Sequence, residues 1–232
     1  MKRSAFFSVL VFTVVGVSLL ISGCSKDDEN PVNPPSGTAR VMVIHASPDA
    51  PGVDLYVDNA RVDSNLTFLG NTGYVDIAAG IRMVKVTVTG TTTPVIEGPV
   101  PVTAGTVYSV FAADSAASIF PLLLVDTLTA PAAGKAHVRF VHLSPNAPAV
   151  DVTLENGTVV FGNRAFGEYT GFTPLDAGSY VLQVREAGTT NIVLTLPSIT
   201  LEAGKIYTVY AKGFAGVTSG AQALGAEIIV NN

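Results

Sequence analysis

Residues 39–54 read ARVMVIHASPDAPGVD, and residues 136–151 read AHVRFVHLSPNAPAVD. Nine of the sixteen positions are identical, and the two stretches align without a gap. The match continues downstream, because Ala79-Gly80 corresponds to Ala177-Gly178 and residues 104–110 correspond to residues 203–209. Self-similarity of this kind is typical of duplicated structural units. We therefore predict two copies of one domain, repeat 1 at residues 39–130 and repeat 2 at residues 136–232.

Both copies are rich in short runs in which apolar and polar residues alternate, separated by Gly, Pro and Asn. Such alternation predicts β-strands, and the chain lacks long segments with apolar residues at helical spacing. The predicted fold is all-β. It consists of two tandem immunoglobulin-like antiparallel β-sandwiches, which follow a signal peptide and a Pro-rich linker.

The two copies together predict which face of each strand is buried. In the first strand His45 and His142 alternate with neighbours on the opposite face, where repeat 2 carries Arg139. A charged residue indicates the less buried face, so we expect the histidines to point toward the core. In the second strand Asp54 and Asp151 predict a solvent-exposed face by the same argument.

Turn residues delimit the strands. Asn156-Gly157 predicts a type I′ hairpin turn, and Asp58-Asn59 fills the same place in repeat 1. Tyr108 and Tyr207 follow Ala-Gly turns in a pattern that resembles the tyrosine corner of immunoglobulin-like domains, in which the phenol hydroxyl bonds backbone across a turn. The three prolines of residues 94–101 favour an edge strand.

The N-terminus has the zones of a secretory signal. Basic Lys2 and Arg3 precede an apolar run that extends to Ile21. This run approaches the length of a transmembrane helix, so an uncleaved membrane anchor is the alternative to a cleaved signal.

Residues 21–24, Ile-Ser-Gly-Cys, decide between these alternatives because they resemble the lipobox of bacterial lipoproteins. That resemblance implies a signal peptide at residues 1–23, cleavage before Cys24, and acylation of Cys24 by chains such as palmitate. Cys24 is the only cysteine in the chain. Two or more acyl chains would hold the mature protein stably on a membrane.

The segment after Cys24 predicts where the protein is displayed. Residues 25–29, Ser-Lys-Asp-Asp-Glu, resemble the acidic tag that directs some lipoproteins to the cell surface. The Pro-rich composition of the following residues indicates an extended linker, so we assign residues 24–38 to the lipidated cysteine and a flexible linker. The expected location is the cell envelope, as an outer-membrane lipoprotein exposed at the surface.

The charge of the chain excludes one class of partner. The sequence has 13 basic residues, of which two lie in the predicted signal peptide. The mature chain therefore has 11 basic and 18 acidic residues, a formal net charge of −7. Nucleic-acid binding needs clustered Lys and Arg, so we expect no nucleic-acid partner.

The repeated motif resembles a known family. The segment HASPDAPGVDLYVD at residues 45–58, with the Ala-Gly turns and the Tyr-x-Val strand, is similar to domain of unknown function 4397. The resemblance covers nearly all of residues 39–232. Repeat 2 departs from the motif at Leu143 and Asn146. The family is common in secreted and surface bacterial proteins, so the resemblance implies the fold and the location. Because the family has no established activity, the resemblance implies no function.

Two alternatives give the repeated motif a chemical role. The first is a hydrolytic site, because the two motifs contain the residue types of a catalytic triad, namely His45, Ser47, Asp49 and Asp54 in repeat 1 and His142, Ser144 and Asp151 in repeat 2. A triad needs its base within hydrogen-bond reach of the nucleophile, whereas each His and Ser here lie two residues apart on one strand. We expect instead that Ser and Asp shape the turn through backbone N–H groups, while the histidine bonds a buried carbonyl or the Asp54 carboxylate.

The second alternative is a calcium site formed by Asp49, Asp54, Asp58 and Asp63. Repeat 2 weakens it, because its counterparts include Asn146, and Asp54 and Asp58 lie on a strand rather than in one loop. We expect a solvated acidic face, no metal site and no cofactor.

Aromatic residues leave one more question open. Phe111 and Tyr210 face away from Tyr108 and Tyr207, so they could form a small glycan-binding patch or pack the two domains together. The function that fits these observations is a non-catalytic surface lipoprotein whose sandwiches serve adhesion, ligand binding or envelope structure. Its expected partners are membrane lipid through acylated Cys24 and an extracellular protein or glycan. A surface hydrolase or calcium-binding protein is the alternative.

Overall fold

A computed structural model describes residues 36–232, which belong to one compact unit. The predicted signal peptide at residues 1–23, the predicted lipidation site Cys24 and residues 25–35 of the predicted linker lie outside the described residues. The described chain is built from strands and turns, which confirms the predicted all-β class. Over residues 36–232 no helix is long and apolar enough to cross a membrane.

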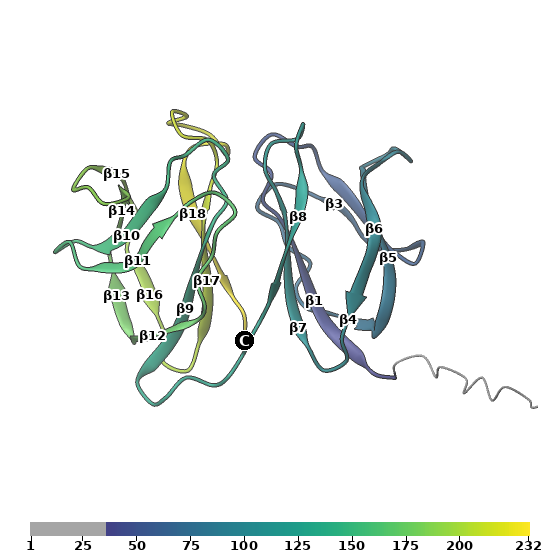
Figure 1. Cartoon of the computed structure of the whole chain (residues 1–232), viewed down its shortest axis with the longest axis horizontal. Helices are drawn as coiled ribbons and strands as arrows, with labels where there is room; N and C mark the ends of the chain where they lie inside the picture. The colour runs from purple at the N-terminus through teal and green to yellow at the C-terminus, as the bar shows by residue number, and fades with distance from the viewer. Residues whose placement is uncertain (1–35) are drawn as a thin grey trace, which may run out of the picture. The chain divides into compact units, whose positions relative to one another are not determined.

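Eighteen strands make up the two repeats (Figure 1). Repeat 1 contains β1 (Thr38–His45), β2 (Val53–Val57), β3 (Ala60–Leu66), β4 (Val75–Ala78), β5 (Gly80–Val88), β6 (Pro94–Val102), β7 (Val107–Ala113) and β8 (Phe120–Val125). Repeat 2 contains β9 (Lys135–His142), β10 (Val150–Leu154), β11 (Val159–Arg164), β12 (Thr173–Asp176), β13 (Gly178–Tyr180), β14 (Leu182–Glu186), β15 (Ile192–Thr195), β16 (Ile199–Leu201), β17 (Ile206–Lys212) and β18 (Gly225–Val230).

Each repeat has two four-stranded sheets. In repeat 1 their strand orders are β4-β1-β7-β8 and β3-β2-β5-β6, and in repeat 2 they are β12-β9-β17-β18 and β11-β10-β14-β15, with β13 and β16 as a separate pair. The sandwich prediction is confirmed. The sheets are antiparallel except where β1 pairs with β7 and β9 pairs with β17, which are parallel pairs that the sequence pattern did not predict. The Pro-rich strand β6 lies at a sheet edge, as predicted.

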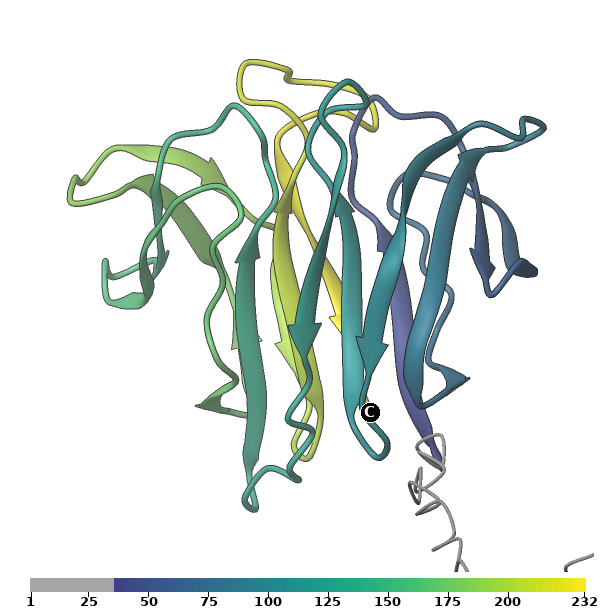
Figure 2. The same cartoon turned by 45° about the vertical axis from the view of Figure 1, so that its right-hand side comes forward.

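The two repeats meet through one sheet each. Ten buried residues form a shared apolar cluster, drawn from β1, β7, β8 and the adjoining turns of repeat 1 and from their counterparts in repeat 2. Figure 1 and Figure 2 show the sheet that contains β7 facing the sheet that contains β17. Residues 36–232 therefore hold three apolar layers, one inside each sandwich and one between the sandwiches.

This shared layer corrects one prediction. The face of Arg139 was expected to be the less buried one, but Arg139 is 2% exposed, and Met42 and Ile44 on the same face of β1 are 2% and 0% exposed. The histidines are fully buried as well, so both faces of β1 and β9 are covered. Each repeat thus has a core of its own, and the shared layer adds a further one in which the outer sheet of each sandwich covers that of the other.

The turns agree with the sequence in part. The type I′ prediction is wrong for Asn156-Gly157, because only Gly157 has a positive φ, of 86°, and its N–H donates to the Leu154 carbonyl across a three-residue loop. Asp58 and Asn59 instead both have positive φ, as a type I′ turn requires. Both tyrosine corners are confirmed. The N–H of Thr103 donates to the Tyr108 hydroxyl at 3.3 Å, and that of Glu202 to the Tyr207 hydroxyl at 3.1 Å.

Candidate functional site

Each repeated histidine ends its strand and holds the turn that follows. His45 and His142 are the last residues of β1 and β9, and both side chains are 0% exposed. Nε2 of His45 lies 3.1 Å from the Pro51 carbonyl oxygen, and Nε2 of His142 lies 3.1 Å from that of Pro148. Burial lowers the pKa of both rings, so the neutral form is favoured. A neutral ring that donates through Nε2 satisfies a carbonyl six residues along the chain.

The serines of the motif do not bond the histidines. The Ser144 hydroxyl donates to the Gly213 carbonyl at 2.7 Å, so it ties the turn to the chain after β17. Ser47 Oγ is buried and has no hydrogen-bond partner among the described residues. The alternative of a hydrolytic site needs the serine hydroxyl to donate to a histidine nitrogen, and neither motif has that contact.

Asp49 and Asn146 bridge to a distant loop rather than shaping their own turn. The Asp49 carboxylate accepts from the N–H of Ala116 at 2.8 Å, in the loop between β7 and β8. Asn146 both donates to the carbonyl of Ala215 and accepts from its N–H, in the corresponding loop between β17 and β18. The motif therefore joins two loops at one end of each sandwich.

Asp54 and Asp151 also serve the backbone. Asp54 is 6% exposed, which corrects the predicted solvent-exposed face at this position. Its Oδ1 accepts from the N–H of Asn65 and the hydroxyl of Thr89, both at 2.9 Å. The Asn65 N–H is the main cause of a lowered pKa for this carboxyl. The Asp151 carboxylate accepts in the same way from backbone N–H groups, at 2.6 Å from Asn163 and 2.9 Å from Gly188.

The four Asp residues of the calcium alternative each bond a different partner, instead of pointing their carboxylates at one shared site. Asp58, in the turn between β2 and β3, pairs with Arg82 on β5 at 2.9 Å. Asp63 accepts from the N–H of its neighbour Ser64. In residues 36–232 no group of three or more His, Cys, Asp or Glu side chains is arranged to hold a metal ion.

The motif of repeat 2 lines a pocket of about 300 Å³, which we call the turn pocket. Three of its polar side chains are His142, Ser144 and Glu186, and its walls come from the turn after β9, from β14 and β15, and from the ends of β17 and β18. His142 Nδ1 is buried there without a hydrogen-bond partner. The structure thus brings two predicted site residues, His142 and Ser144, together around a space.

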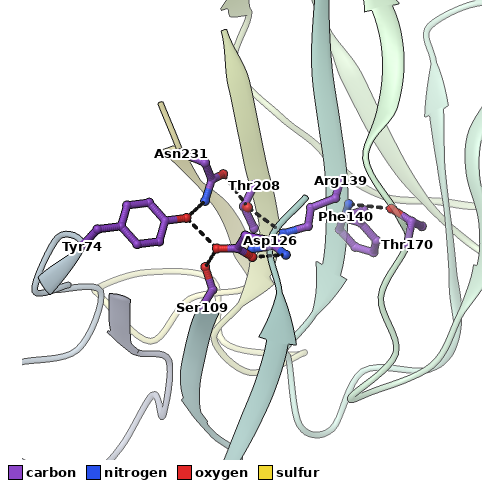
Figure 3. A network of polar contacts seen from close by, with 8 residues as sticks. All are labelled: Tyr74, Ser109, Asp126, Arg139, Phe140, Thr170, Thr208 and Asn231. Carbon is purple, nitrogen blue, oxygen red and sulfur yellow. Dashed lines mark hydrogen bonds and ion pairs between the residues drawn. The ribbon is translucent and has the colours of Figure 1, made fainter. Parts of the chain in front are cut away.

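A buried polar network, which the sequence did not predict, joins the two repeats (Figure 3). Asp126, which directly follows β8, lies 2.6 Å from the Arg139 guanidinium on β9, and their side chains are 0% and 2% exposed. The other Asp126 oxygen accepts from the hydroxyls of Tyr74 at 2.5 Å and Ser109 at 2.7 Å. Burial first, and then the bond to Asp126, raises the pKa of Tyr74 to about 12.

Repeat 2 completes this network. Nε of Arg139 donates to the hydroxyl of Thr208 at 2.8 Å, and this hydroxyl donates to Asn231 at 2.7 Å. The amide of Asn231 in turn donates to the Tyr74 hydroxyl at 2.9 Å. Arg139 also lies 4.6 Å from the centre of the Phe172 ring. Six side chains from both repeats are thus linked in one chain of polar contacts.

The network is built at equivalent positions of the two copies. Ser109 bonds Asp126 as Thr208 bonds Asn231, and the N–H groups of Asp126 and Asn231 donate to equivalent carbonyls at the start of β7 and β17. Phe111 and its counterpart Tyr210 meet edge to face, with ring centroids 5.6 Å apart. The aromatic pair therefore packs the repeats together and does not form an exposed glycan-binding patch, since the two residues are 0% and 1% exposed.

At two pairs of equivalent positions the copies differ in charge. Where repeat 2 has Arg139, repeat 1 has Met42, and where repeat 1 has Asp126, repeat 2 has Asn231. Each charge thus occurs once and faces its opposite across the interface. A comparison of the copies for such unmatched charges was the signal that could have identified this pair from the sequence.

A family comparison agrees with the duplicated fold. The model of domain of unknown function 4397 (DUF4397) matches residues 39–153 and 154–231. The chain belongs to the DUF4397 family. The border between the two matched segments falls inside β10. In the structure of this DUF4397 protein the border between the repeats lies between β8 and β9, because no sheet contains strands from both sides of it. A search of curated proteins found no match.

Three similar solved structures show how distant such matches can be. A DUF3823 family protein from Bacteroides ovatus is 12% identical, with 72% of this chain and 98% of that chain covered and a TM-score of 0.23. A structure described as alpha-glucan binding by a streptococcal virulence factor is 11% identical, with 80% and 97% covered and a TM-score of 0.25. A family 26 carbohydrate-binding module from Eubacterium rectale is 8% identical, with 83% and 95% covered and a TM-score of 0.24.

Proposed function

We propose that this protein is a non-catalytic surface lipoprotein whose two sandwiches act as one rigid module for adhesion, ligand binding or envelope structure. The lipid anchor is acylated Cys24, and the location is the outer surface of the cell envelope. The partner is an extracellular protein or a glycan, and the turn pocket of repeat 2 is the place where we expect it to bind.

One observation carries the non-catalytic part of the proposal. In repeat 2 the groups that a hydrolase would need are engaged with the backbone, because His142 bonds the Pro148 carbonyl and the Ser144 hydroxyl donates to the Gly213 carbonyl. A nucleophile and base that bond separate carbonyls have no shared proton to transfer. The buried interface supports the rigid module, since it joins the repeats through both apolar packing and an ion pair.

A hydrolase is the second candidate, because His142, Ser144 and Glu186 line the same pocket. Partner capture and ester or glycoside hydrolysis are measured with residues 36–232, as the wild type and as Glu186→Gln, which leaves the turn bonds intact. We expect capture of a defined partner without turnover, and weaker capture by the variant. Turnover in the wild type that Ser144→Ala abolishes would establish the hydrolase instead.

The anchor is tested separately with the full chain. Cys24→Ser removes the sulfur that accepts the lipid, so we expect loss of labelling by an alkyne fatty acid and accumulation of the uncleaved precursor. The control is the wild-type chain in the same cells, with surface protease digestion as the readout of display. Retained label and normal cleavage in the variant would contradict lipidation at this residue.

A further inference from the structure

Repeat 1 contains an apolar cavity between its two sheets. Its volume is about 240 Å³, and residues of both sheets line it, with Val as the commonest type. The sequence pattern explains this position, because Val41 and Val43 on β1 alternate inward toward Leu55, Val84 and Val86 on the opposite sheet.

Repeat 2 has larger side chains in the part of its interior that corresponds to Val43, although the turn pocket, lined by Val184 and Ala211, lies at one end of it. Its Phe140 is buried and stacks on Phe161 with ring centroids 6.1 Å apart. Repeat 1 has Val43 at the position of Phe140. Phe161 pairs with Val152 on β10, whereas in repeat 1 Asp63 pairs with the equivalent Leu55 on β2. The larger Leu182 likewise replaces Val84. The fold therefore tolerates a filled interior, and repeat 1 differs by smaller side chains.

The cavity is reached at an edge of the sandwich. Pro121 and Leu123 of β8 and residues 96–102 of β6 line it, and these are edge strands of the two sheets. Leu123 is 41% exposed, which is unusual for a side chain that faces a sandwich interior. An elongated apolar molecule could therefore enter between β6 and β8.

The charges at the cavity indicate the class of ligand. Among its lining residues only Arg82 and Glu97 are charged, and Arg82 already pairs with Asp58 at 2.9 Å. These three groups carry a net negative charge, so an anionic headgroup would be repelled. An apolar cavity of about 150 Å³ holds a benzene molecule, so the larger volume here suits a longer aliphatic chain.

We propose that the interior of repeat 1 is a binding site for an uncharged aliphatic chain, which occupies the space that Phe140 and Phe161 fill in repeat 2. This site is separate from the turn pocket of repeat 2. It depends neither on lipidation of Cys24 nor on the absence of catalysis, so the tests are independent.

Octanol is the probe, with octanoate as its charged counterpart, and binding is followed by calorimetry and by the melting temperature of residues 36–232. We expect octanol to raise the melting temperature in a concentration-dependent way, because it binds only the folded state. Val43→Phe copies the residue of repeat 2 and should abolish this shift. Ile81→Phe adds the same ring at a position that is 72% exposed and outside the cavity lining, and it should leave the shift unchanged.

Val84→Leu is a milder variant, to be used if the phenyl ring of Val43→Phe prevents folding. One added methylene displaces about one ligand methylene, so octanol affinity should fall about fourfold. The proposal is overturned if octanol does not bind the wild type, or if Val43→Phe and Val84→Leu both bind it as the wild type does. Tighter binding of octanoate than of octanol would overturn the assignment of an uncharged ligand.

Discussion

The buried ion pair between the repeats gives the sharpest quantitative prediction. Asp126→Asn removes one charge and leaves the Arg139 guanidinium, which is 2% exposed, without its counter-ion. An uncompensated buried charge typically destabilises a protein by about 3 to 5 kcal/mol, and Arg139→Met should cost a similar amount because it leaves Asp126 unpaired. A loss of this size is a large part of a total stability of about 5 to 15 kcal/mol.

The double variant Asp126→Asn with Arg139→Met separates the charge effect from packing. It places in each repeat the residue that the other copy carries at the equivalent position, Asn231 and Met42. Both charges are gone, so we expect stability close to that of the wild type, within about 2 kcal/mol. The coupling energy from the four proteins should therefore be about 3 kcal/mol or more in favour of the pair.

The assay is guanidinium unfolding of residues 36–232, followed by tyrosine fluorescence and circular dichroism. The control is the surface pair Lys135–Asp176, whose nitrogen and oxygen are 2.8 Å apart but whose side chains are 38% and 77% exposed. Asp176→Asn should cost less than about 1 kcal/mol because water screens that pair. The reasoning is refuted if Asp126→Asn costs no more than Asp176→Asn, since the charge would then not be buried in solution.

Three further predictions concern the shared interface and the repeated motif. Residues 36–130 produced alone should self-associate or bind added residues 131–232, measured by light scattering, because their outer sheet loses its cover; a stable monomer that ignores the other repeat would contradict the shared core. Stability should fall as the pH drops below about 6.5, by up to about 1.4 kcal/mol per pH unit for each buried histidine, since the pKa of each ring is lowered on folding and the unfolded chain then binds more protons. In His45→Asn with His142→Asn this slope between pH 6.5 and 5 should flatten, and an unchanged slope would assign it to other groups. Tyr207→Phe should cost about 1 kcal/mol in thermal unfolding, because the Glu202 N–H loses its acceptor, whereas an unaffected melting temperature would remove the tyrosine corner from the stabilising contacts.

Much of the fold could be predicted because it depends on local patterns. Alternation along β1 and β10 indicated strands, and the tyrosine corner needs only a tyrosine a few residues after a turn. The prolines of β6 indicated an edge strand because a proline cannot donate to a neighbouring strand. In each case the prediction depends only on residues that are near one another in sequence.

The site residues show where local patterns end. Asp49 was expected to shape its own turn, yet its carboxylate bonds Ala116, 67 residues away. The histidines bond carbonyls six residues along the chain, a distance that sequence spacing allows, but the alternation pattern could not choose between the Pro51 carbonyl and Asp54. A side chain with several acceptors within reach is oriented by the packing around it.

The sequence by itself determined the duplication, the strand pattern of each copy, the family, and the expectation of an exported lipid-anchored chain. Only the tertiary structure decided that the two copies share a core, that Asp126 and Arg139 meet inside it, and that repeat 1 is hollow where repeat 2 is filled. The physical reason is that alternation reports whether one face of a strand differs from the other. When a second domain covers the outer sheet, both faces are buried, and only three-dimensional packing shows which side chains face each other across each layer.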